Sequence, residues 1–210
     1  MIDQNITELV DSLVRLSKQK TNFDFEERVA IFNKLSKVKR NIIDVYDHPI
    51  LNVTLKKPQH LYVNDYNPNF IAPPEKKLLL HSIQRDGLTL PIIVCPIQKD
   101  NNVIIDGHHR FTLIKSKPNL ISNLQGYIPT VSLKRDLPER MSATIRHNLA
   151  KGQHQVELTS QLLLKLKALN WTDDAISNEL GMDRDEILRM LQTTGLLEAF
   201  GNRPFSKAWV

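Results

Sequence analysis

The chain has 210 residues, of which 28 are Lys or Arg and 23 are Asp or Glu, giving a formal net charge of +5. This length predicts one domain with a substantial appendage or two small domains. The hydrophobic share of 41% and the charged share of 24% exclude a disordered, collagen-like or coiled-coil-only chain. This net positive charge favours polyanionic binding partners.

Apolar runs in the sequence are short, such as residues 91–96, and the amino terminus is polar and acidic. A membrane span needs roughly 20 apolar residues, so we expect a cytoplasmic protein with no membrane segment. The single cysteine, Cys95, lies inside an apolar run and can form neither an internal disulfide nor a thiolate metal cluster. We expect it to be a buried small hydrophobe.

Residues 2–40 show the spacing of two amphipathic helices. The first stripe contains Ile6, Leu9, Val10, Leu13 and Leu16, and the second contains Phe25, Val29, Phe32 and Leu35. Between them, Thr21, Asn22 and Asp24 supply candidate N-cap residues ahead of Glu26 and Glu27, whose charges favour a helix start. The pattern predicts a helical hairpin in an N-terminal region of residues 1–54.

Residues 55–136 carry short apolar runs separated by turn residues, which is typical of a compact mixed unit. The expected elements are a strand at 61–63, a helix at 74–86 that ends at Gly87, a strand hairpin at 91–95 and 103–105, a helix at 111–116 and a strand at 128–131. We therefore expect an α+β fold with this mixed core between helical appendages.

From residue 137 to residue 210 the apolar spacing is helical. Within this segment, residues 173–192 have the spacing of a helix-turn-helix, with a small Ser177, a turn Gly181 and a core Ile187. On the exposed face of its second helix, the residues suited to contact DNA are Arg184, Asp185, Arg189 and Gln192. Such a unit also serves as a packing module, and one copy would bind DNA weakly, so we expect a homodimer or a partner subunit.

The densest polar constellation is residues 106–110, where a strand ends in Asp106 and Gly107 and a helix starts with His108, His109 and Arg110. Helix N-terminal amides, a glycine and a guanidinium suit an anion. The Asp106 carboxylate has the chemistry to orient a histidine, to accept a hydroxyl proton or to hold Mg²⁺. The alternative is an exposed Asp-Gly turn with no ligand. A zinc site is disfavoured because adjacent side chains on a helix diverge by about 100°.

The order of the segments around this turn resembles the ParB/sulfiredoxin superfamily. That order runs through residues 67–69, 82–94, 106–110, 128–131 and 145–151. The resemblance implies a bound nucleoside triphosphate, CTP or ATP, accompanied by Mg²⁺. The residues that it implies for nucleotide binding are Gly87, Gly107, His108, His109, Arg110, Arg146, Asn148 and Lys151, with His147 and His154 also within reach. Lysine at position 151 replaces the arginine typical of ParB-like proteins and loses its bidentate fork.

The Asp-Gly-His-His-Arg form of the turn is similar to that of free-serine kinases in this superfamily. This similarity implies an alternative function, a small-molecule kinase or nucleotidase with Asp106, His108 and His109 as catalytic residues and Mg²⁺ bridging the phosphates. Sulfiredoxin activity is not expected, because that enzyme has a catalytic cysteine in this turn and the present chain has none there.

The whole arrangement is similar to the IbrB-like group, co-activators of prophage gene expression that join a ParB-like core to a helical DNA-binding segment. The first hypothesis is therefore a transcriptional co-activator that binds a nucleotide and DNA. This resemblance also implies a partner protein like phosphoadenosine phosphosulfate reductase. A third possibility is a scaffold whose pocket is vestigial.

Overall fold

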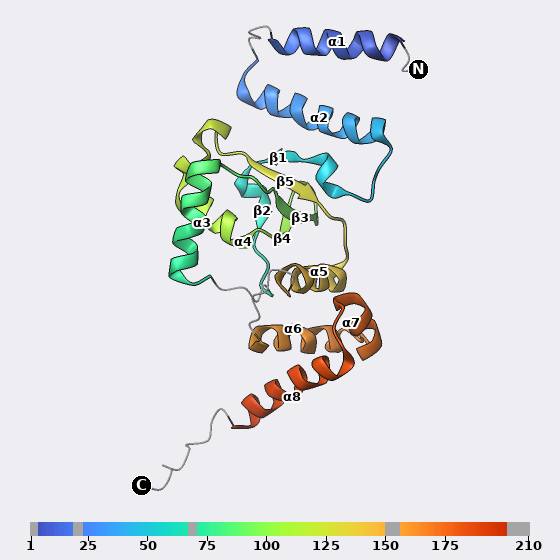
Figure 1. The fold of residues 1–210 in the computed structure, drawn as a ribbon, viewed down its shortest axis with the longest axis vertical. Coiled ribbons are helices and arrows are strands. Elements are labelled where there is room, and N and C mark those ends of the chain that lie inside the picture. The colour runs from blue at the N-terminus through green and yellow to red at the C-terminus, as the bar shows by residue number, and fades with distance from the viewer. Residues whose placement is uncertain (1–3, 19–22, 67–70, 150–155, 201–210) are drawn as a thin grey trace.

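The computed structural model describes residues 4–18, 23–66, 71–149 and 156–200. It is a mixed α+β structure in which a five-stranded sheet lies between two N-terminal helices and a C-terminal helical segment (Figure 1). The predicted fold class is confirmed, including both helical appendages. Among the described residues, no helix combines the length and apolar character that a membrane crossing requires.

The N-terminal helices are α1 (Gln4–Lys18) and α2 (Phe25–Ile43), and they run in roughly opposite directions (Figure 1). The start of α2 is fixed by a capping box. The Asp24 carboxylate accepts a hydrogen bond from the Glu27 amide at 2.8 Å, and the Glu27 carboxylate accepts one from the Asp24 amide at 3.0 Å. This confirms the predicted helix boundary.

The sheet has the strand order β1-β5-β3-β4-β2. Its strands are β1 (Thr54–Lys56), β2 (Leu61–Tyr62), β3 (Ile92–Pro96), β4 (Asn102–Asp106) and β5 (Ile128–Ser132). The predicted hairpin is β3–β4, antiparallel with Val94 opposite Ile104. β1 pairs antiparallel with β5, whereas the β2–β4 and β3–β5 pairs are parallel.

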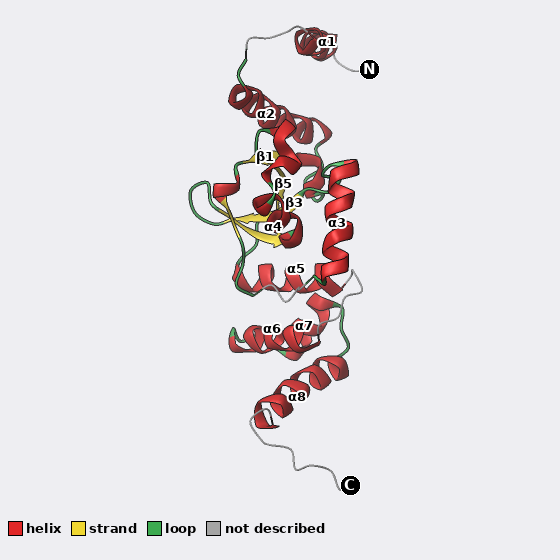
Figure 2. Ribbon diagram, turned by 90° about the vertical axis from the view of Figure 1, so that its left-hand side faces the viewer, coloured by secondary structure: helices red, strands yellow, loops and turns green. Residues whose placement is uncertain are grey.

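Two helices, α3 (Pro73–Asp86) and α4 (His108–Ser116), lie beside the sheet (Figure 2). The prolines at the start of α3 need no amide partner there, and its end is set by Gly87 at φ 73°. The core between sheet and helices buries Leu61, Ile92, Val94, Ile104, Phe111, Ile114, Ile121 and Ile128. Cys95 is buried on the other side, as predicted, and its thiol donates to the Arg135 carbonyl at 3.2 Å.

The C-terminal segment contains α5 (Leu137–Leu149), α6 (Val156–Ala168), α7 (Asp173–Leu180) and α8 (Arg184–Phe200). α5 lies between the sheet and the other three helices (Figures 1 and 2). A second core of buried apolar residues joins these helices: Tyr66, Met141, Ile145, Leu162, Leu163, Leu166, Ile176, Leu180, Met182, Ile187 and Met190.

The predicted helix-turn-helix is formed by α7 and α8. Gly181 adopts the left-handed conformation, with φ 67° and ψ 28°, which closes α7 and allows the tight turn. Ser177 also stabilises this turn, because its hydroxyl donates to the Met182 carbonyl at 2.6 Å.

Candidate functional site

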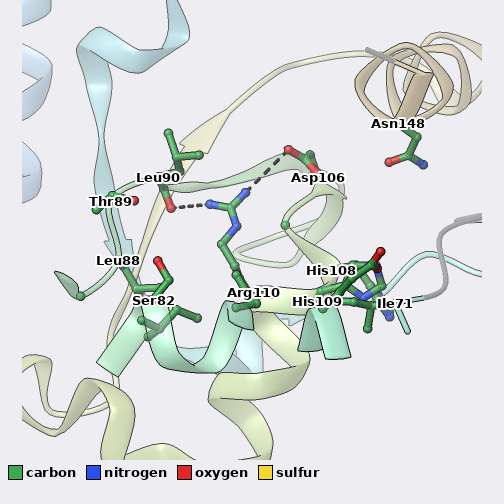
Figure 3. A pocket seen from close by; sticks show the side chains of 15 residues that line it. Ile71, Ser82, Leu88, Thr89, Leu90, Asp106, His108, His109, Arg110 and Asn148 are labelled. Carbon is green, nitrogen blue, oxygen red and sulfur yellow. Dashed lines mark hydrogen bonds and ion pairs between the residues drawn. The ribbon is translucent and has the colours of Figure 1, made fainter. Parts of the chain in front are cut away.

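A cavity of about 490 Å³ opens where α3, the loop at residues 87–90 and the start of α4 meet (Figure 3). The structure brings most of the predicted site residues to it, namely Gly87, Asp106, Gly107, His108, His109, Arg110 and Asn148. Asp106 ends β4, Gly107 precedes α4, the next three residues begin α4, and Asn148 comes from the last turn of α5. Asp106 and Asn148, which are 42 positions apart in the sequence, therefore both line this cavity.

Gly107 is the N-cap of α4 and has φ 96° and ψ 17°. No side chain caps this helix, and its first backbone hydrogen bond runs from the Phe111 amide to the Gly107 carbonyl at 2.9 Å. The first-turn amides of a helix have no partner within the helix, and its N-terminus carries a partial positive charge. The start of α4 is thus suited to bind an anion that enters the cavity.

The guanidinium of Arg110 lies against the backbone of the loop that leads into β3. Its Nη1 donates to the carbonyls of Leu90 and Pro91, the latter at 3.0 Å, and its Nη2 lies 3.6 Å from the Asp106 carboxylate. Burial lowers the pKa of Arg110, and the Asp106 charge opposes this effect. Arg110 therefore clamps the loop to the end of β4 and places a fixed positive charge in the cavity wall (Figure 3).

Asp106 also faces His147 of α5, because its Oδ2 lies 4.0 Å from Nδ1 of His147. The Asp106 side chain is 13% exposed, so it is held between Arg110 and His147. That Asp106 orients a histidine stays a prediction. The histidine at ion-pair distance is His147.

His108 and His109 project from the first turn of α4 with ring centroids 5.5 Å apart and planes at 83°. The Nδ1 of His108 is buried and has no hydrogen bond to any described residue. Desolvation lowers the pKa of His108, which favours the neutral ring near neutral pH. In the described part of the chain, no group of three or more metal-ligating side chains is found.

The other half of the cavity is largely apolar and was not predicted from the sequence. It is lined by Ile71, Glu75, Leu79, Ser82, Ile83, Leu88, Thr89 and Leu90. The signal that could have identified its helical part is the spacing of Glu75, Leu79 and Ser82, which places all three on one face of α3.

Three residues expected at or near the nucleotide lie elsewhere or outside the described residues. Arg146 does not line the cavity, because its Nη1 donates to the Glu179 carbonyl at 3.0 Å and also contacts the Glu179 carboxylate. It thereby joins α5 to α7. Lys151 lies outside the described residues, as does His154.

Arg184, Asp185, Arg189 and Gln192 are all exposed on α8, as the spacing predicted. Arg184 contacts the Asp174 carboxylate of α7. Residues 173–192 contain six acidic and two basic side chains, so this segment has a formal net charge of −4, whereas the whole chain has +5.

Comparison with known proteins places these features in a family. Residues 154–202 match the family model described as the IbrB-like C-terminal HTH domain. The chain is 41% identical to YbdM of Escherichia coli (strain K12) over 184 residues, which is 88% of each protein. The chain belongs to the YbdM family. The resemblance of the C-terminal segment to the IbrB-like group is therefore confirmed, and it lies in a YbdM-family protein.

Two solved structures of the chromosome-partitioning protein ParB from Caulobacter crescentus, C-terminally truncated, overlap part of this YbdM-family fold. The complex with CTP-gamma-S matches with a TM-score of 0.41 and 15% identity, covering 70% of this chain and 83% of that one. The complex with the centromeric parS site matches with a TM-score of 0.43 and 14% identity, covering 71% and 79%. Overlap at this level transfers no ligand to the YbdM-family chain.

Proposed function

We propose that this YbdM-family protein is a nucleotide-responsive, DNA-binding transcriptional co-activator. In this proposal, the cavity binds the phosphates of a nucleoside triphosphate and the helix-turn-helix contacts DNA. The observation that carries the proposal is the start of α4, where an uncapped helix N-terminus opens into a cavity beside Arg110 and the buried Nδ1 of His108.

The two halves of the cavity support a nucleotide rather than a free inorganic anion. The half formed by α4 offers helix amides and Arg110 to phosphate oxygens, which carry negative charge. The apolar half, formed by α3 and the loop at 87–90, suits a base and a sugar. The volume of about 490 Å³ lies within the usual range of small-molecule sites.

Consecutive residues of α5 provide a route from the cavity to the helix-turn-helix. Asn148 lines the cavity, His147 faces Asp106, and Arg146 binds Glu179 of α7. A ligand that displaces the last turn of α5 would therefore displace α7 as well. Nucleotide occupancy would in this way alter the grip on DNA.

The DNA-binding half of the proposal rests on the IbrB-like HTH match and on the exposed residues of α8. The acidic surroundings of Arg184 and Arg189 make one copy a weak binder, so a dimer is needed for stable contact. The sequence resemblance makes CTP and ATP the nucleotides to test first. It also makes a phosphoadenosine-phosphosulfate-reductase-like protein the partner to test, and prophage genes the target.

A second candidate is transfer or hydrolysis of the terminal phosphate. It is favoured by the placement of Asp106 and the neutral His108 in the same cavity as the anion-binding start of α4. Asp106 would hold Mg²⁺ or accept a hydroxyl proton, and His108 would act as a base.

Retention of labelled genomic DNA fragments by the full chain separates these candidates. The regulator predicts retention that depends on CTP or ATP without consumption of the nucleotide, and that falls in the Arg189→Ala variant. The enzyme predicts nucleoside diphosphate release with Mg²⁺, or phosphoserine when free serine is added, and loss of product in His108→Ala. DNA retention that is unaffected by nucleotide, together with no turnover, contradicts both.

A further inference from the structure

The outer side of α3 carries a row of basic side chains. Lys77, His81 and Arg85 are four residues apart, so at 100° per residue they lie within about 80° of the helix surface. All three are exposed, whereas Ile83 on the opposite side of the helix is buried. Glu75 lies outside this row and lines the cavity. In Figures 1 and 2, no described element covers the outer side of α3, so these charges face solvent.

The positive surface continues from α3 to the end of α4. A groove of about 500 Å³ lies between these segments, and Gln84, Lys117 and Asn119 are among the residues that line it. Residues 76–85 and 107–120 contain no Asp or Glu. The exposed cations of the two segments, none of which forms an ion pair with a described residue, are Lys76, Lys77, Arg85, Lys115 and Lys117.

The positive charge of the chain lies in the core rather than in the helix-turn-helix. Residues 55–136 contain 11 Lys or Arg and 6 Asp or Glu, which gives a formal net charge of +5, against −4 for residues 173–192. In addition, Arg184 of the helix-turn-helix is already paired with Asp174. Attraction of a polyanion by unpaired cations is therefore strongest on the core.

The composition of this basic face fits the backbone of duplex DNA better than an acidic protein or a single strand. Protein interfaces centre on aromatic and apolar anchors, and on α3 the one exposed large hydrophobic side chain is Leu78. Single strands stack their bases on aromatic rings, but residues 76–85 contain no Phe, Tyr or Trp, and Phe111 of α4 is buried. The row on α3 spans about 12 Å, a length over which one DNA strand carries about three or four phosphates.

We propose that the outer side of α3, together with Lys117, is a second DNA contact, which binds the phosphate backbone of a duplex without reading its sequence. Lys77, Arg85 and Lys117 supply the charge. The amides of Gln84 and Asn119 donate to phosphate oxygens in the groove between them. This contact goes beyond the proposed function, because it needs neither the nucleotide nor the helix-turn-helix.

Fluorescence anisotropy of a labelled DNA duplex of random sequence, titrated with the full chain at several low salt concentrations and without nucleotide, tests this contact. Each phosphate contact contributes about 0.9 to the slope of log affinity against log salt. We expect the Lys77→Gln/Arg85→Gln/Lys117→Gln variant to bind at least about tenfold more weakly and to lower this slope by about 2–3. None of the three residues lines the cavity, so CTP binding should be unchanged.

The matched control is Lys34→Gln/Lys37→Gln/Lys39→Gln on α2, which removes the same charge from three exposed positions and should retain the wild-type slope. A wild type that binds no duplex at low salt overturns the proposal. Equal weakening in the two triple variants also overturns it, because net charge alone would then explain the binding. Displacement of the duplex by poly-aspartate at an equal concentration of charges would assign the face to an acidic protein instead. Since the assay contains no nucleotide, its failure is distinct from failure of the nucleotide-dependent retention proposed above.

Discussion

Replacing Gly107 with alanine tests whether the start of α4 and the Arg110 clamp form one rigid unit. Gly107 has φ 96°, and an added Cβ would lie 3.1 Å from Nη2 of Arg110 and 3.2 Å from Cγ1 of Ile92. Both contacts are tighter than ordinary packing, so the guanidinium and the Ile92 side chain must each give way by a few tenths of an ångström. The guanidinium is held by the carbonyls of Leu90 and Pro91 and by Asp106, so any movement weakens these interactions.

Gly126 is the matched control. It has φ 82°, and an added Cβ would meet no atom within 4 Å. Placing alanine in the left-handed region should destabilise either variant by roughly 1–2 kcal/mol. At Gly107, the shift of Arg110 also weakens its hydrogen bonds to the Leu90 and Pro91 carbonyls, which adds up to about 1 kcal/mol.

The assay is urea unfolding of the full chain followed by circular dichroism, with the free energy extrapolated linearly to water. We expect Gly107→Ala to lose more stability than Gly126→Ala and to bind CTP at least tenfold more weakly. Equal losses of unfolding free energy in the two variants would refute the role given to the Arg110 clamp, and unchanged nucleotide affinity in Gly107→Ala would refute the site.

Three further outcomes are expected. Burial lowers the pKa of His108 below its ordinary 6.5, so the unfolded chain takes up this proton first and the free energy of unfolding falls as pH drops from 6.5 toward the folded pKa. Unfolding measured at several pH values should show a shallower fall in His108→Gln, and a fall as steep as that of the wild type would contradict this. Ser177→Ala removes the hydrogen bond to the Met182 carbonyl and should lower the free energy of unfolding by about 1 kcal/mol. Ser12→Ala on exposed α1 should leave it unchanged, and equal unfolding free energies in the two variants would count against the turn assignment. Arg189→Ala should reduce the slope of log affinity for DNA against log salt by about 1, and a slope equal to that of wild type would show that Arg189 contacts no phosphate.

Local sequence signals predicted the elements whose ends are set by their own residues. The Asp24 capping box, the stop of α3 at Gly87 and the Gly181 turn all depend on side chains or on glycine within a few positions of the boundary. The β3–β4 hairpin was predicted for the same reason, since both strands and their turn are contiguous.

Features that depend on distant partners were harder to predict. β1 is three residues long and exists because Thr54 and Leu55 pair with Thr130 and Pro129 of β5, which are more than 70 positions away. No short-range pattern marks such a strand. The apolar half of the cavity was missed for a related reason, because it forms only when α3 packs beside α4.

The position of Arg146 illustrates the limit of transferring a role by sequence order. The residue stands in the segment that resembles the nucleotide-binding helix, but neighbouring positions on a helix point in different directions. His147 and Asn148 point toward the cavity region, and Arg146 therefore faces α7, where Glu179 pairs with it.

Calorimetric titration of the full chain with CTP and with ATP, in the presence of Mg²⁺, tests the central claim most directly. We expect saturable binding of one nucleotide per chain by the wild type, and a loss of that heat in Gly107→Ala while Gly126→Ala retains it. Absence of binding by the wild type at millimolar nucleotide, or equal binding by both variants, would contradict the proposal that the start of α4 holds the phosphates.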